Sequence, residues 1–222
     1  MSYAYNMSNQ YIRPDDGNAV MAAVGNLMPS ILVEAIYDGM YKYFRSRDLD
    51  PEAYTEYTDC TRSNQLYDRI ARSARDLLDA LNNSELYYRT TDNKRATDFY
   101  LDTRFAFRVK RSKRNRNNLT TNVPTQRQHW IKPSSAMVSI GQLVLPYPSN
   151  QIVVSDQDRL WLTVAFDLDD AEEAIEKIFI GWELKNKFAW KDRLEVPTEE
   201  VLASLPKPVA DAIGEKRRGR SA

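Results

Sequence analysis

Hydrophobic residues recur with two different periods along this chain, and the change of period limits the folds that it can adopt. Over residues 33–44 and 66–81 they recur every three or four positions, as on one face of an amphipathic helix. Over residues 99–109 they alternate instead, which is typical of a strand with one buried face. The sequence therefore predicts an α+β fold, in which two antiparallel N-terminal helices pack on an antiparallel sheet and short helices follow at the C-terminus.

The same patterns divide the 222 residues into parts. Residues 1–16 are polar and lack a period, so they are predicted to be a flexible N-terminal arm. Residues 17–214 are predicted to form a single α+β domain, with a helical part over 17–84 and a strand-rich part over 96–195. The basic residues 215–222 are predicted to be a disordered tail.

Four segments of the strand-rich part are predicted to be strands. The last two are predicted to form a hairpin, because the polar residues 169–174 between them suit its loop. A helix from Ala171 to Lys177 is the competing interpretation. Thr198 is predicted to cap a C-terminal helix, with Glu199 and Glu200 in the first turn, where the helix dipole favours them. The four predicted strands are residues 98–111, 135–147, 159–170 and 174–185.

Charge is unevenly distributed, although the formal net charge is zero. No acidic residue lies between Asp102 and Asp156, whereas nine Lys or Arg residues do, all of them in residues 104–132, which we call the basic segment. Phosphate backbones attract such clusters, because each neutralised phosphate releases counterions, and neighbouring aromatic rings can stack on bases. The residues predicted to bind nucleic acid or another partner are Arg104, Arg108, Lys110, Arg111, Lys113, Arg114, Arg116, Arg127, His129, Trp130 and Lys132.

The basic segment has other interpretations that the sequence leaves open. The partner is DNA, RNA or an acidic protein surface. The charges alternatively face solvent or protect the edge of a sheet from aggregation, and Phe105 and Phe107 then belong to the core face of a strand. The helical pair serves for packing or for self-association as a homodimer.

One tripeptide suggests an alternative, enzymatic function. Glu183 and Lys185 alternate onto one face of a predicted strand, as in metal-dependent nucleases of the PD-(D/E)XK kind, with Asp98, Asp102, Asp167 or Asp169 as an upstream acid. In that chemistry the carboxylates hold Mg²⁺ and the lysine assists the attacking water. The Pro-Asp expected on the preceding strand is missing, and a solvent-facing Glu and Lys on an edge strand is the competing interpretation. Apart from this Mg²⁺-dependent alternative, the sequence predicts no catalytic residue and no cofactor.

Composition excludes several other classes. With Cys60 and His129 as the single residues of their types, the chain offers neither an internal disulfide nor a Cys/His zinc site. No apolar run approaches the about 20 residues that span a bilayer, and the first residues do not resemble a signal peptide. The expected location is the cytoplasm, without membrane contact.

Three stretches carry a resemblance to known proteins: "DTRFAFRVKR", "NVPTQRQ" and the hairpin around "VAFDLDD" and "IEKIFIGWEL". Residues 98–195 resemble uncharacterised bacterial proteins encoded in mobile elements beside helix-turn-helix repressors or toxin–antitoxin genes. The resemblance implies a setting of regulation or phage defence, and it offers no catalytic residues to carry over. The expected function is that of a non-enzymatic interaction protein in a bacterial or phage regulatory or defence module that is toxin–antitoxin-like.

Overall fold

The structure, a computed structural model, describes residues 12–81, 85–90, 97–114, 120–121, 159–169, 173–184 and 187–221. The first two helices form where the apolar three- and four-residue spacing occurs, and Pro29 is accommodated in the first turn of the second. The described helices are α1 (Gly17–Val24), α2 (Leu27–Leu49), α3 (Pro51–Glu56), α4 (Asp59–Leu81), α6 (Glu199–Ser204) and α7 (Lys207–Ser221).

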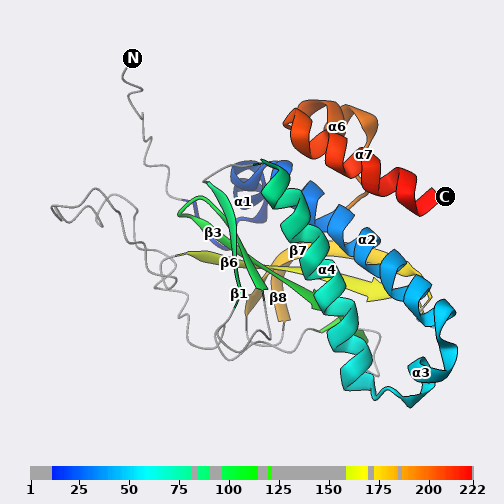
Figure 1. Cartoon of the computed structure of the whole chain (residues 1–222). Coiled ribbons are helices and arrows are strands. Elements are labelled where there is room, and N and C mark those ends of the chain that lie inside the picture. The colour runs from blue at the N-terminus through cyan, green and yellow to red at the C-terminus, as the bar shows by residue number, and fades with distance from the viewer. Residues whose placement is uncertain are drawn as a thin grey trace, which may run out of the picture.

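Six strands form one sheet in the order β1-β2-β3-β6-β7-β8 (Figure 1). Neighbouring strands are antiparallel except β3 and β6, which run parallel, so the predicted α+β class is confirmed but the sheet is mixed. The short strands β4 and β5 pair with each other in a second, two-stranded sheet. The strands are β1 (Leu86–Thr90), β2 (Thr97–Leu101), β3 (Phe105–Arg111), β4 (Lys113–Arg114), β5 (Thr120–Thr121), β6 (Leu160–Leu168), β7 (Ile175–Leu184) and β8 (Lys187–Leu194).

Helices α2 and α4 lie side by side, antiparallel, over one face of the six-stranded sheet (Figure 1). Gly39 allows their close approach, because a Cβ atom there would lie 2.7 Å from the backbone of Ile70. Alternate residues of β3, among them Phe105 and Phe107, are buried in the core between helices and sheet. The predicted helical pair is confirmed, and it shares one apolar core with the sheet.

The prediction of one continuous strand over residues 98–111 is wrong, because these residues form the β2–β3 hairpin. Leu101 at the end of β2 pairs with Phe105 at the start of β3. Asp102 makes the turn: its φ of 49° lies in the left-handed region, and its carboxylate accepts a hydrogen bond from the Arg104 backbone N–H at 2.6 Å. The apolar residues keep an even spacing through the turn, so alternation alone does not reveal it.

The predicted hairpin between β6 and β7 is confirmed, with Asp167 paired to Lys177. The competing helix from Ala171 to Lys177 is wrong, because β7 already begins at Ile175. Thr198 caps α6 as predicted, its hydroxyl accepting a hydrogen bond from the Val201 N–H at 3.4 Å. The strand predicted over residues 135–147 lies outside the described residues.

Residues 12–16, predicted to belong to a flexible arm, have defined contacts. The carbonyl of Pro14 accepts a hydrogen bond from the indole N–H of Trp190 at 2.7 Å, and Ile12 packs against the core. Asp16 caps α1 by accepting a hydrogen bond from the Ala19 N–H at 3.1 Å. The prediction is therefore wrong for this stretch, while residues 1–11 lie outside the described residues.

None of the described helices is by itself long and apolar enough to cross a membrane. Helices α1 and α2 meet that criterion only when taken together, across a bend of 85°. Most of α2 is buried in the core.

Candidate functional site

The structure divides the cations of the basic segment among several places. Arg104 lies in the β2–β3 turn, Arg108 and Lys110 lie within β3, and Arg111 is its last residue. Their alternation puts Arg108 and Lys110 on the face of the sheet opposite α2 and α4, which we call the back face. Lys113 and Arg114 form β4. The other predicted binding residues lie outside the described residues: Arg116, Arg127, His129, Trp130 and Lys132.

Arg108 is engaged in a buried ion pair. Its guanidinium binds the carboxylate of Asp98 in a bidentate manner, with Nε 2.6 Å from Oδ1 and Nη2 2.7 Å from Oδ2. The two residues are cross-strand partners in β2 and β3, and their side chains are only 8 % and 1 % exposed. Arg108 therefore holds two strands together, and its charge is matched within the protein.

Lys110 is matched in the same way by Glu183 of β7. Its Nζ lies 2.9 Å from Glu183 Oε2, which also accepts a hydrogen bond from the Thr163 hydroxyl at 3.0 Å. Burial lowers the pKa of Lys110 below its ordinary value, although the hydrogen bond and charge of Glu183 act in the opposite direction. Glu183 therefore compensates the buried positive charge of Lys110 on the back face.

In the described part of the chain, the candidate acids of the nuclease alternative do not form a metal site with Glu183. Asp98 is bound by Arg108, and Asp167 lies 3.4 Å from Lys177 Nζ. Asp102 uses its carboxylate in the β2–β3 turn, where it also binds Arg104 Nε at 2.8 Å. Asp169 accepts hydrogen bonds from the Glu173 and Ala174 N–H groups in the β6–β7 turn, at the opposite end of that hairpin from Glu183. Within the described residues, no three acidic, His or Cys side chains are close enough to hold a metal ion. Lys185 lies outside the described residues.

The aromatic rings on the back face are different from those that the sequence suggested. Phe105 and Phe107 are core residues. Instead, Tyr87 of β1 stacks on Tyr100 of β2, with ring centroids 4.8 Å apart and an interplanar angle of 14°. Trp161 of β6 meets Tyr100 edge-on at 6.3 Å. The sequence reasoning missed Tyr87 because β1 was not predicted, although "LYYRT" has the aromatic and β-branched composition of a strand.

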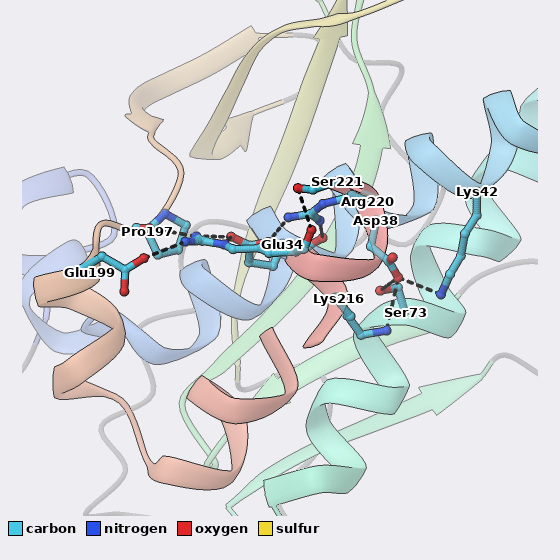
Figure 2. Close-up of polar contacts among 10 residues, drawn as sticks. Glu34, Asp38, Lys42, Ser73, Pro197, Glu199, Lys216, Arg220 and Ser221 are labelled. Atoms are coloured by element: carbon cyan, nitrogen blue, oxygen red, sulfur yellow. Dashed lines mark hydrogen bonds and ion pairs between the residues drawn. The ribbon is translucent and has the colours of Figure 1, made fainter. Parts of the chain in front are cut away.

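A second charged cluster connects helix α2 with the C-terminal helix α7, and Figure 2 shows its polar contacts. Glu34 and Asp38 lie one turn apart on α2, and both are buried. The carboxylate of Glu34 binds Arg217 Nε at 2.8 Å and Arg220 Nη2 at 2.7 Å, while Asp38 binds Lys216 Nζ at 3.1 Å. We call these five residues the α2–α7 charge cluster.

The α2–α7 charge cluster overturns the prediction of a disordered basic tail. Residues 215–221 continue α7 to its end at Ser221. They are ordered because their cations neutralise carboxylates that the apolar surroundings of α2 would otherwise leave uncompensated. Val209 and Ile213 anchor the preceding turns in the core.

Asp38 makes the stability of this cluster sensitive to acid. Burial raises the pKa of Asp38, but hydrogen bonds from Lys42 and Ser73 and the charge of Lys216 outweigh burial, so that its pKa lies below the ordinary value of 3.8. A carboxyl group with a depressed folded-state pKa stabilises the fold above its unfolded pKa. This stabilisation is lost as the pH falls through the folded pKa.

We expect Asp38→Asn to flatten the acid limb of the stability curve. In the unmodified protein the free energy of unfolding should fall between about pH 4 and about pH 2. In Asp38→Asn it should fall less over that range, because the asparagine side chain takes up no proton on unfolding. Urea unfolding at a series of pH values measures the difference. Asp211→Asn, at an exposed aspartate of α7, controls for the loss of one charge. Parallel curves for all three proteins would contradict the expectation.

An open groove of about 570 Å³ lies on the outer side of α2 and α4 beside the α2–α7 charge cluster. Its charged lining combines three cations with two carboxylates, so its charge favours neither an anionic nor a cationic ligand. The lining residues are Lys42, Gln65, Asp68, Arg69, Arg72 and Asp76.

Two further cations of the basic segment, Lys113 and Arg114, follow β3 out of the six-stranded sheet. The Ser112 N–H still binds the Phe166 carbonyl at 2.8 Å, as the last contact with β6. Beyond it, Lys113 pairs with Thr121, and Arg114 pairs with Thr120, in the two-stranded β4–β5 sheet. The chain between β4 and β5 contains Arg116. We call Arg111, Lys113, Arg114 and Arg116 the basic ribbon.

Comparison with known proteins does not assign this arrangement to a family. No protein-family model matches the chain, and no curated protein or solved structure matches it.

Proposed function

We propose that the protein is an interaction protein that binds nucleic acid through the basic ribbon. One observation carries the proposal. Within the acid-free stretch, the chain leaves the six-stranded sheet after β3, and β4 and β5 pair with each other as a separate two-stranded ribbon. Lys113 and Arg114 form one strand of this ribbon, and the sequence has four cations within residues 111–116. Clustered Lys and Arg residues gain affinity for phosphates of either single- or double-stranded nucleic acid through counterion release.

Two other cations of the basic segment are engaged by carboxylates on the back face. Arg108 and Lys110 are held by Asp98 and Glu183 on the back face, so phosphates would have to compete with buried carboxylates for them. The basic ribbon follows these two residues along the sequence, and no acidic residue lies between it and Asp156 in the sequence. The resemblance of residues 98–195 to mobile-element proteins is the ground for expecting this binding in a regulatory or defence module.

We expect replacement of all four ribbon cations by alanine to weaken binding by about tenfold or more, because up to four phosphate contacts are lost. The measurement is the affinity of the purified chain for labelled single- and double-stranded DNA and RNA at low salt. A matched variant loses four exposed cations elsewhere, Arg45, Arg72, Lys207 and Arg218, and should bind nearly as the unmodified protein does. Thermal unfolding checks that each variant keeps the fold.

The same experiment separates the competing functions. Equal weakening in the ribbon variant and in the matched variant would show that net charge, not the ribbon, attracts the nucleic acid. Cleavage that requires Mg²⁺ and is lost in Glu183→Ala would favour the nuclease alternative. Absence of binding at low salt would overturn the proposal and direct attention to an acidic protein partner.

A further inference from the structure

The edge of the back face next to β2 carries an accessible aromatic ring on a rigid support. Tyr87 is 37 % exposed, whereas Tyr100 and Trp161 behind it are buried. Tyr87 and Tyr100 are cross-strand partners in β1 and β2, and their rings stack nearly parallel. One face of the Tyr87 ring is thus fixed against the sheet, and the side chain still reaches solvent.

Arginine side chains surround these rings. Arg159 lies over the Tyr100 ring at 4.7 Å and over the Tyr87 ring at 5.8 Å, and its Nη2 donates a hydrogen bond to the Tyr87 hydroxyl at 2.6 Å. Arg89 is exposed two residues along β1 from Tyr87, on the same face. The hydroxyl contact sets the orientation of the Tyr87 ring before any ligand arrives.

We infer that Tyr87 is a stacking platform for an unpaired nucleobase, so that the preferred ligand is single-stranded nucleic acid. The inference rests on the proposed function and specifies its ligand. Bases of a single strand stack on aromatic side chains, whereas those of a duplex are already stacked on both faces. Glu85 and Arg89 both lie two residues from Tyr87 along the chain, and the charge of Arg108 is matched by Asp98, so the stacked ring and not a positive surface is the feature that selects a base here.

The platform and the basic ribbon lie within reach of one bound strand. Tyr87 pairs with Tyr100, which pairs with Ala106 of β3. Five residues of β3 then lead to Arg111, a separation of about 17 Å along the strand. Single-stranded sites of about 4–16 nucleotides are common, so one strand can contact both places.

The test compares two probes of about 12 nucleotides, a thymidylate oligomer and an abasic oligomer with the same number of phosphates. The unmodified chain should bind the thymidylate probe about tenfold or more tightly than the abasic probe, because stacking of even one base has that effect. Tyr87→Leu, which removes the ring, should lower this ratio about fivefold or more and leave binding of the abasic probe unchanged. Tyr87→Phe keeps the ring but loses the hydroxyl contact with Arg159, so it should lower the ratio less than Tyr87→Leu does. Tyr57→Leu, on the helical side of the molecule, is the matched control.

The outcomes distinguish the platform from the proposed function. If both probes bind equally well and with salt sensitivity, the platform is overturned while the basic ribbon keeps its function. If neither probe binds, the proposed function fails and the platform fails with it. If Tyr87→Leu does not fold, photocrosslinking of the unmodified chain to an iodouridine-substituted probe decides: a crosslink at Tyr87 supports the platform, and crosslinks at other residues alone overturn it.

Discussion

Replacing Arg217 and Arg220 together by alanine is expected to lower the free energy of unfolding by about 3–5 kcal/mol. Both guanidinium groups bind the carboxylate of Glu34, whose side chain has no exposed surface. The double variant leaves this carboxylate in the α2 core without either cation, and an uncompensated buried charge is far costlier than a lost surface pair. Urea unfolding at neutral pH measures the change.

Two controls make this expectation specific to the α2–α7 charge cluster. Arg45→Ala combined with Arg218→Ala removes two exposed arginines and should change the free energy of unfolding by less than about 1 kcal/mol. Adding Glu34→Met to the double variant removes the uncompensated charge and should recover part of the loss. A loss no larger than that of the exposed pair would contradict the role assigned to Arg217 and Arg220.

Arg108→Ala is expected to destabilise the protein by a similar amount, about 3–5 kcal/mol. The substitution removes a bidentate partner from Asp98, whose side chain is 1 % exposed. It should leave the salt dependence of nucleic-acid binding unchanged, because the account makes Arg108 a link between β2 and β3. Denaturant unfolding and a salt series on the same preparation measure both properties.

Arg104 provides the matched control in the same hairpin. It forms an ion pair with Asp102 in the turn, where the Arg104 side chain is 41 % exposed, and exposed pairs contribute about 0–1 kcal/mol. Arg104→Ala should therefore cost much less than Arg108→Ala. Equal losses in the two variants would show that burial of the Asp98 pair has little influence on stability.

Much of the fold could be predicted from local patterns. The helical pair and the β6–β7 hairpin follow from apolar spacing, and the α6 cap follows from Thr198 and the two glutamates after it. The edge strands β1 and β8 were missed because edge strands carry exposed, charged residues that weaken alternation. The β2–β3 turn was missed because Asp102 interrupts the strand without changing the parity of the apolar positions.

The roles of the charged residues were harder to predict, because they depend on partners in space. Glu34 and Arg217 lie near opposite ends of the chain, so nothing in the local sequence marks the C-terminal cations as partners of buried carboxylates. The Asp98–Arg108 pair could have been predicted from the sequence, because opposite charges at facing positions of a hairpin attract each other. Recognising it required the turn at Asp102 first. Without that turn, Arg108 and the ribbon cations look alike.

The most direct test of the account is the salt dependence of single-stranded DNA binding by the unmodified chain and by the variant that lacks the four ribbon cations. The logarithm of the binding constant should fall with the logarithm of salt concentration, by about 0.7 for each neutralised phosphate. The account predicts that the ribbon variant has a slope shallower by about 2–3, with the fold intact. A slope that is the same in both proteins would contradict it, because the phosphate contacts would then lie elsewhere.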